Sequence, residues 1–311
     1  MRPFNAASPM IFTRQSVAFL GLGLISGSLA SALRASGWQG ELLGWGPREP
    51  SLKRGLELGI IDRYSLDLDE IIDSSDMLII GAPPVATGDL LAELLPKAMA
   101  SAHQPIVTDL ASIKGWVIDR ANCEYSRFVP GHPIAGSEHS GVAASRADLF
   151  SGREVILTPN ADLDPIALQE VTAMWALTGA RVTHMPVADH DAALAASSHS
   201  PHMLAYALTM ALADDPLQPM QHGGGALRDM TRIAGSDPVM WRDIALTNRA
   251  ALLTALTEVE GGLAHLKRLI EASDGSGMHA YFTRCRDVRR AHDRVLNPLF
   301  EQSDSNEESK P

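Results

Sequence analysis

The stretch Ser16–Ala35, SVAFLGLGLISGSLASALRA, joins a short apolar run to a glycine-rich turn and then to a run of small and apolar residues. The first run predicts a buried strand, and the last predicts a helix over Ser28–Ala35. The turn between them reads Gly21-Leu22-Gly23-Leu24-Ile25-Ser26. Gly21 permits a tight turn, and Gly23 allows a phosphate to approach the N–H groups at the positive end of the helix. This order of elements indicates a site for a dinucleotide pyrophosphate.

The third position of the glycine spacing holds Ser26, with Gly27 beside it. A small residue still allows the helix to pack closely on the strand, so the departure weakens the pattern only slightly. A glycine-rich turn without any ligand stays open as the alternative.

Arg48 follows the second predicted strand, Glu41–Gly44. Sites for NAD usually place a carboxylate at this strand end, where it accepts a hydrogen bond from the ribose 2′-hydroxyl. The sequence Gly44-Trp45-Gly46-Pro47-Arg48 has no carboxylate, and a guanidinium there can pair with a 2′-phosphate. The pattern therefore favours NADP over NAD. The alternative is that Arg48 is an ordinary surface residue and that the pocket accepts either cofactor.

Strand and helix signals alternate along the first half of the chain. Helices are predicted at Ser51–Leu58, with Ser51 as N-cap, at Thr87–Met99 and at Pro165–Leu177. The further strands are predicted at Asp76–Gly81, Pro105–Asp109, Arg127–Pro130, Glu154–Leu157 and Arg181–His184. Because parallel strands need crossovers, this alternation predicts an α/β, Rossmann-type domain whose mainly parallel sheet is covered by helices on both faces.

After Pro186 the strand signals stop, and an all-helical region is predicted. Its four helices are Leu194–Ala213, Ala226–Ile233, Asp237–Lys267 with Pro238 in the first turn after its cap, and Met278–Leu296. The last helix carries arginines that we expect to form a solvated face, namely Arg284, Arg286, Arg289, Arg290 and Arg294. The predicted organisation is an N-terminal extension (1–15), a dinucleotide-binding domain (16–186), a helical domain (187–300) and a disordered acidic tail (301–311).

The composition excludes several classes of function. With 26 Lys and Arg against 37 Asp and Glu, the net charge of −11 repels nucleic acid and anionic lipid surfaces. The most apolar stretch, Val17–Leu33, is interrupted by glycines and serines, so no membrane span is expected, and Met1–Gln15 lacks the apolar segment of an export signal. Cys123 and Cys285 form neither a zinc pattern nor a disulfide framework, which is typical of a cytoplasmic protein.

Two polar segments follow predicted strands and are candidates for catalysis. Gly131–Ser137, GHPIAGS, places His132 in a loop just past a strand, where histidine can exchange a proton near neutral pH. Ser112 and Lys114 follow the strand that ends at Asp109 and should face the same crevice. Capping or packing is the alternative role for His132, and an N-cap of the next helix is the alternative for Ser112.

The helical half contributes further candidates. His199 and His202 are three residues apart and therefore lie on one face of a helix. No third ligand with metal-site spacing accompanies them, so we expect no metal there and assign both to substrate binding or structural hydrogen bonds. Arg232 lies among apolar residues and needs a carboxylate partner if it is buried. That partner is either a ligand or an internal acid such as Asp229 or Asp243.

Taken in order, the segments GLGLISGS, TDLASIKG, PGHPIAGSEHSG, SHSPHMLAYAL and TRIAGSDPVMWRDI resemble the prephenate dehydrogenase family, which includes arogenate dehydrogenases. The resemblance covers about residues 16–296. It implies oxidative decarboxylation of prephenate or arogenate, in tyrosine biosynthesis, with hydride transfer to NADP or NAD. It also implies a homodimer formed by the helical domain, and the apolar character of Leu194–Ala213 independently indicates that a partner subunit covers this helix.

The resemblance assigns roles to individual residues. His132 corresponds to the catalytic histidine that accepts the proton of the ring hydroxyl, and Ser112 to a serine that hydrogen-bonds near it. Arg232 matches an arginine that binds a substrate carboxylate, while His199 and His202 match histidines that line the substrate pocket.

Two other functions fit parts of this sequence. A dehydrogenase of the 3-hydroxyacid or 6-phosphogluconate type usually has a lysine base in its helical domain, but the only lysine between Pro186 and Phe300 is Lys267, late in a helix. A redox sensor that binds NADP without catalysis would need neither His132 nor Arg232.

Overall fold

A computed structural model of the protein describes residues 11–136 and 139–296. The chain divides into two compact units, the first ending at Leu252 and the second beginning at Leu253. The predicted acidic tail and most of the predicted N-terminal extension lie outside the described residues.

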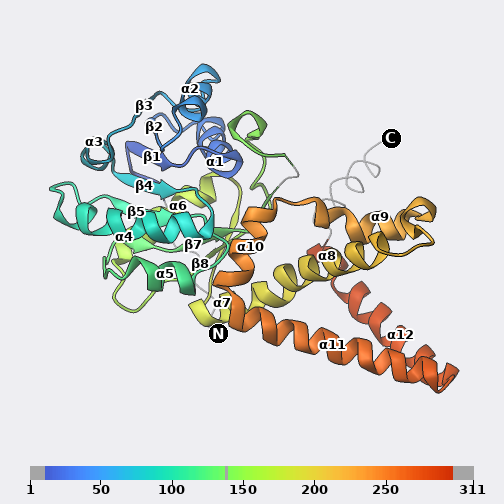
Figure 1. Ribbon diagram of the computed structural model, residues 1–311. Helices are drawn as coiled ribbons and strands as arrows, with labels where there is room; N and C mark the ends of the chain where they lie inside the picture. Colours follow the sequence, from blue (N-terminus) through green and yellow to red (C-terminus); the bar gives the residue numbers. More distant parts are fainter. Residues whose placement is uncertain (1–10, 137–138, 297–311) are drawn as a thin grey trace, which may run out of the picture. The chain divides into compact units, whose positions relative to one another are not determined.

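Six parallel strands form the main sheet, in the order β3-β2-β1-β4-β5-β6 (Figure 1). The parallel sheet predicted from the alternation of strands and helices is therefore confirmed. Strand order reverses between β1 and β4, and ligands bind at such switch points in open α/β sheets. The strands are β1 (Ser16–Leu20), β2 (Glu41–Trp45), β3 (Arg63–Ser65), β4 (Met77–Ile80), β5 (Ile106–Asp109) and β6 (Phe128–Val129), of which β3 was not predicted.

Both faces of this sheet are buried by helices. Alternate residues of β1 belong to different cores: Val17 and Phe19 to one, Ala18 and Leu20 to the other. The first core includes residues of α1 (Leu24–Ala35), α2 (Glu49–Glu57) and α6 (Pro165–Leu177), and the second those of α3 (Leu68–Asp73), α4 (Pro84–Ala100) and α5 (Gly115–Ala121). The unbroken apolar strand sequences follow from this two-sided burial.

Several helices begin earlier than predicted, among them α1, which starts at Leu24 rather than Ser28. Helix α2 starts at Glu49, so Ser51 lies inside the helix and its prediction as N-cap was wrong. Helix α4 starts at Pro84 rather than Thr87. Proline fits the first helical turn because the N–H that it lacks has no partner there. The prolines that seemed to precede these helices therefore belong to their first turns.

A second, smaller sheet contains β7 (Gly131–Pro133), β8 (Glu154–Leu157) and β9 (Arg181–His184). Strands β7 and β8 are antiparallel, and β8 and β9 are parallel. The prediction of one sheet with a loop at Gly131–Ser137 was therefore wrong, because His132 lies in a strand opposite Ile156. Pro130 has no N–H to continue the pairing of β6, and the chain turns to pair with β8 instead.

The region after Pro186 is helical, as predicted. Helix α7 (Val187–Leu194) continues through a π-helical segment, Ala195–His199, into α8 (Ser200–Ala213). The predicted helix Asp237–Lys267 is two helices that meet at Asn248, although Asp237 caps the first by accepting the N–H of Met240 at 2.8 Å. The remaining elements are α9 (Gly225–Thr231), a 3₁₀ turn (Arg232–Gly235), α10 (Pro238–Thr247), α11 (Arg249–Glu271), α12 (Gly275–Ala291), α13 (Asp293–Leu296) and 3₁₀ turns at Val142–Ala144 and Pro219–His222.

Helices α7 and α10 contact helices of the sheet region, α7 packing on α5 and α10 on α4. Ile113, between β5 and α5, forms a small core with Trp241 and Ile244 of α10, and α10 contacts α4 near one end of that helix (Figure 1). This packing explains why the first compact unit reaches Leu252, well beyond the change from strands to helices at Pro186.

The structure also bears on the predictions for the α12 arginines, the two cysteines and membrane spans. The expected exposure of the α12 arginines holds for Arg284, Arg286, Arg289 and Arg290, whereas the side chain of Arg294 lies outside the description. Cys123 and Cys285 are free thiols. Across residues 11–136 and 139–296, no helix combines the length and the apolar character that crossing a bilayer requires.

Gly81, just after β4, is expected to contribute to stability because an added Cβ would meet the Ser26 hydroxyl and lie 3.0 Å from the Gly21 carbonyl oxygen. Gly81→Ala should lower the free energy of unfolding by about 1–3 kcal/mol, as overpacking typically does. Urea denaturation measures this. As a control, Gly261→Ala adds a Cβ with no atom within 4 Å and should not destabilise the protein. Equal losses in both variants would contradict the close approach.

Candidate active site

The glycine-rich turn lies at the switch point between β1 and β4. Gly21 has a φ of +94°, and its N–H donates to the Trp45 carbonyl at 2.8 Å. A Cβ on Gly21 would come 2.6 Å from the Gly81 carbonyl oxygen, so only glycine fits. Gly23 is the N-cap of α1 and has open space around it, with no atom within 4 Å of an added Cβ. The first N–H groups of α1 can therefore reach an anion without steric obstruction.

Ser26 occupies the third position of the pattern and is buried. The close approach that a glycine usually permits here is provided from the opposite side, because Gly81 has no side chain to contact the Ser26 hydroxyl. Gly27 fulfils a separate need, since a Cβ there would collide with Ser145. Sequence reasoning missed Gly81, although its place at the end of the apolar run DMLIIG was a usable signal.

Arg48 is exposed at the start of α2, just beyond the end of β2. Its cationic neighbours are already paired: Lys53 with Glu49 at 3.2 Å, and Arg54 with Glu57 at 3.1 Å. Within residues 11–136 and 139–296, Arg48 makes no ion pair. It is therefore the cation of this strand end that is available to a ligand.

A chain of hydrogen bonds connects three residues around β7 and α7. His132 Nδ1 lies 3.0 Å from His190 Nε2, and His190 Nδ1 lies 2.8 Å from Asp191 Oδ1. His190 is fully buried and His132 nearly so. The Nε2 atom of His132 has no hydrogen-bond partner among the described residues. One nitrogen of His132 is thus held in place while the other remains available for chemistry.

The beginning of α5 anchors Asp191. The Lys114 N–H donates to Asp191 Oδ1 at 2.9 Å, and the Gly115 N–H donates to Oδ2 at 2.8 Å. Burial alone would raise the pKa of Asp191, but hydrogen bonds from His190 and from these two N–H groups outweigh it and hold the pKa below its usual value. Asp191 is therefore an ionised carboxylate at neutral pH.

Lys114 is fully buried and makes an ion pair with Asp109, while its Nζ donates to the Gly131 carbonyl at 2.6 Å. Burial lowers the pKa of Lys114, and Asp109 opposes this change. The ion pair ties β5 to β7 next to His132. Ser112 lies half-buried in the same connection. The N-cap of α5 is Lys114, so the alternative of Ser112 as that cap is wrong.

Burial is also the main influence on the pKa of His132. It lowers the pKa of His132 well below 6.5, and the neighbouring His190, Lys114 and His199 lower it further. His132 is therefore neutral at physiological pH and can accept a proton.

His199 and His202 both contact Trp241. The rings of His202 and Trp241 stack with centroids 3.5 Å apart, whereas His199 meets the indole edge-on at 6.1 Å. Asn248 Nδ2 lies 3.1 Å from His199 Nδ1 and donates to the Asp191 carbonyl at 2.9 Å. Burial lowers the pKa of His199 to about 4. The fold thus brings the predicted histidine pair beside the His132 group.

Arg232 begins the 3₁₀ turn before α10 and is exposed. It is close enough to His202 that its charge, after burial, lowers the pKa of this histidine. The two acids proposed as internal partners pair with other arginines: Asp229 with Arg228 at 3.2 Å, and Asp243 with Arg242 at 2.6 Å. The influence of Arg232 on His202 places its guanidinium near this histidine.

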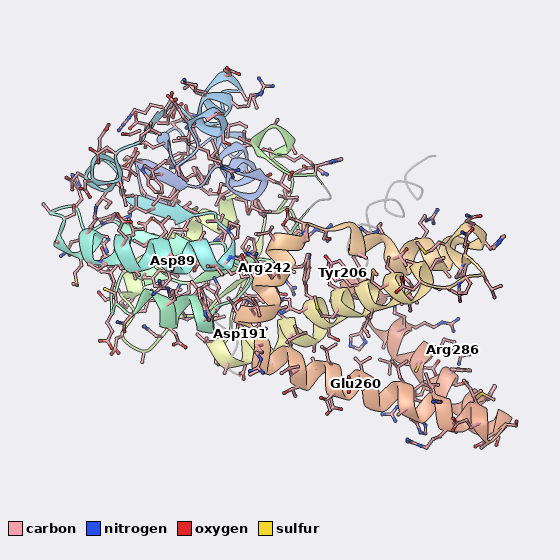
Figure 2. The ribbon with its side chains drawn as sticks, viewed as in Figure 1. Asp89, Asp191, Tyr206, Arg242, Glu260 and Arg286 are labelled. Atoms are coloured by element: carbon pink, nitrogen blue, oxygen red, sulfur yellow. The ribbon has the colours of Figure 1, made fainter. Side chains whose placement is uncertain are left out.

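The sequence predictions missed His190, Asp191, Asn248 and Trp241. The run Asp189-His190-Asp191 is a cluster of titratable residues at the start of a helix, and this was a usable signal. Asn248 had none, because it lies inside what seemed one continuous helix. Figure 2 shows Asp191 where α7 meets the end of α10, and Asn248, just after α10, donates to its carbonyl.

Comparison with known proteins identifies the family of this chain. Residues 29–184 match the family model "Prephenate dehydrogenase, nucleotide-binding domain", and residues 186–284 match "Prephenate dehydrogenase, dimerization domain". The chain is 31% identical to the prephenate dehydrogenase of Bacillus subtilis, covering 89% of this chain and 76% of that protein. It is 32% identical to the cyclohexadienyl dehydrogenase of Zymomonas mobilis, covering 88% and 95%.

A solved structure shows the same fold. The prephenate dehydrogenase of A. aeolicus, in complex with hydroxyphenyl propionate and NAD⁺, superposes with a TM-score of 0.85 at 34% identity and covers 90% of this chain and 99% of that one. The chain described here belongs to the prephenate dehydrogenase family.

Proposed function

We propose that this protein catalyses the oxidative decarboxylation of prephenate or arogenate, as part of tyrosine biosynthesis, with hydride transfer to NADP or NAD. The observation that carries the proposal is His132, a buried neutral base with one nitrogen fixed and the other available. The family membership supplies the reaction class. Relatives named as prephenate and cyclohexadienyl dehydrogenases support the choice of substrates.

The residues of the site fit the requirements of this reaction. A bound nicotinamide dinucleotide supplies the hydride acceptor. His132 accepts the proton of the ring hydroxyl as the carbinol hydrogen departs, and Ser112 hydrogen-bonds near that hydroxyl. Loss of the ring carboxylate as CO₂ then leaves an aromatic ring, which makes the overall reaction favourable. The chain's main contribution is to orient the substrate and to hold the base.

Binding of the substrate carboxylate is proposed for Arg232, with His199 and His202 lining the same pocket. Arg232 and His202 are electrostatically coupled, which supports a shared anion site. The stack of His202 on Trp241 fixes the histidine ring at the edge of this site. Because His199 stays neutral, it contributes a hydrogen bond rather than a charge.

The dinucleotide is proposed to bind along Gly21, Leu22, Gly23, Leu24, Ile25 and Ser26. The open space at Gly23 and the uncapped first turn of α1 support this assignment. For the ribose we propose Arg48 as the partner of a 2′-phosphate, and hence use of NADP at least as well as NAD. Glu49 follows Arg48 in the chain, and its carboxylate already accepts from the Tyr64 hydroxyl at 2.9 Å and pairs with Lys53.

The domain division is proposed to follow the change in secondary structure at Pro186, with dinucleotide binding before it and substrate binding with dimerisation after it. A homodimer through the helical domain is supported by the family model that covers residues 186–284. Large apolar side chains are exposed in the second compact unit, among them Leu253, Leu263, Ile270, Phe282 and Val288. A partner subunit would remove this apolar surface from water.

The competing dehydrogenase class is not supported by the helices. Lys267 is highly exposed and lies 4.0 Å from Glu271, in a position suited to a surface ion pair rather than to a base. Neither observation favours a lysine mechanism.

His132→Asn should lower turnover by about 10²–10⁴-fold, the usual contribution of a general base, while leaving the KM for the cofactor unchanged. In the wild-type protein, kcat/KM should hold constant down to pH 6.5 and fall at lower pH, because protonation of His132 removes the base and its pKa lies below 6.5. Steady-state rates across pH measure both effects. Unaltered turnover in the variant would refute the assignment.

Arg48→Ala should raise the KM for NADP about tenfold and leave that for NAD nearly unchanged, since a charge-assisted hydrogen bond contributes about 1.5–3 kcal/mol. Arg54→Ala is the matched control, because Arg54 already pairs with Glu57. A wild-type protein at least tenfold more efficient with NAD would show that the ribose is recognised in another way.

Sedimentation equilibrium at micromolar concentration should give about twice the chain mass of 33.3 kDa. Phe282→Arg, in α12, should shift the equilibrium towards monomer by placing a charge in the apolar interface. Leu56→Arg changes an exposed apolar residue of α2 instead and should leave the dimer intact. A monomeric wild-type protein would rule out the dimer.

A further inference from the structure

Asp191 reaches two histidines of the candidate site by two separate routes. Its carboxylate accepts from His190, which in turn meets His132. Its backbone carbonyl accepts from Asn248, which in turn meets His199. All four hydrogen bonds are between 2.8 and 3.1 Å long. One residue is therefore connected to both His132 and His199.

The carboxylate route determines where His132 carries its proton. An ionised carboxylate can only accept, so His190 Nδ1 must donate to Asp191. With Nδ1 as the donor, His190 Nε2 serves as the acceptor in the contact with His132, and the N–H that it receives is on His132 Nδ1, 3.0 Å away. His132 Nε2 is left with a lone pair, which is the state that a proton acceptor requires.

By the same reasoning, the backbone route determines which ring nitrogen of His199 carries the proton. A carbonyl oxygen can only accept, so the Asn248 amide must present Nδ2 to Asp191. The second hydrogen of that NH₂ group points to His199 Nδ1, which must therefore be the unprotonated nitrogen. Neutral His199 then carries its hydrogen on Nε2 and is a donor.

We propose that Asp191 is a positioning residue that assigns opposite proton positions to the two histidines, making His132 an acceptor and His199 a donor at their Nε2 atoms. This inference rests on the proposed function for the role of His132 as base. In the reaction, the hydroxyl proton of the substrate moves to His132 Nε2, and the resulting imidazolium keeps its Nδ1–H on His190. A hydrogen bond from His199 Nε2 to a substrate oxygen requires no proton transfer.

Burial keeps the two histidines in these proton positions. His190, His199 and Asn248 are each at most 5% exposed, so water has little access to replace a lost partner. The carboxylate of Asp191 is also held by two N–H groups of α5, which fix its direction. If His132 carried its proton on Nε2 instead of Nδ1, it would direct an N–H at the substrate hydroxyl rather than a lone pair.

Nitrogen-15 NMR of the full chain labelled at histidine tests the proton positions directly, in the absence of substrate and cofactor. Signals are assigned by comparison with His132→Asn and with a His199→Asn protein. We expect His132 as the Nδ1–H form and His199 as the Nε2–H form. The reverse form at either residue, or a mixture of forms at both, would overturn the proposal.

Variants of the carboxylate route and of the backbone route test separately what each contributes to turnover and substrate binding. His190→Leu removes the acceptor and should lower kcat at least tenfold with little change in either KM, given that a misplaced histidine proton costs about 10⁴-fold in the Ser-His-Asp triad. His190→Gln offers an amide oxygen to His132 and should recover part of that loss. Equal turnover in the two variants, or an equal rise in the cofactor KM, would indicate a purely structural role and would overturn the carboxylate route.

Asn248→Asp tests the backbone route, because a carboxylate there would accept from His199 Nδ1 and move its proton. The NMR form of His199 should change while that of His132 stays, and the KM for prephenate should rise. An unchanged His199 form would overturn this route. If His132→Asn is fully active, the proposed function fails while the NMR result stands. If His132→Asn is inactive and the NMR forms are reversed, only the present inference fails.

Discussion

The half-buried carboxylate of Asp191 is the constraint on which the arrangement of the site depends. It accepts N–H groups from the first turn of α5 and a hydrogen bond from His190, and its carbonyl binds Asn248 at the junction of α10 and α11. These contacts connect the sheet region to the helices that follow Pro186. An ionised group is costly to bury unless several donors surround it, so the elements that supply those donors are held together.

A second constraint operates at the switch point of the sheet, where backbone atoms approach closely. Gly21 and Gly81 end neighbouring strands, and neither position has room for a side chain. Ser26 replaces the usual third glycine of the turn, and the absence of a side chain on Gly81 compensates for it. The turn can therefore depart from the glycine pattern and keep an uncapped helix start that is open to phosphate.

Much of the fold was predictable from the sequence. The bounds of β1, β8, β9 and α6 follow from the length of apolar runs and from turn residues, which are local signals. The separate sheet containing His132 was not predictable, because strand partners depend on contacts that no local pattern records. The division of the predicted helix into α10 and α11 at Asn248 was not predictable for a related reason. An asparagine inside an apolar repeat shows its role only once its tertiary partners are known.

The same limit applies to the site. His132, His199 and His202 were recognisable by residue type and by their place beside predicted strands and helices, and the fold brings them close to one another. The residues that orient them, His190 and Asn248, come from other elements. Their importance appears only in hydrogen bonds between groups that are 58 and 49 residues apart in the chain.

The proposed reaction couples hydride transfer to the loss of a carboxylate. Reduced cofactor and CO₂ can be measured together, with prephenate and with arogenate, each with NAD and NADP. We expect equal amounts of reduced cofactor and CO₂ for at least one substrate, together with an aromatic product. Cofactor reduction without release of CO₂, or no reduction with either substrate, would contradict it.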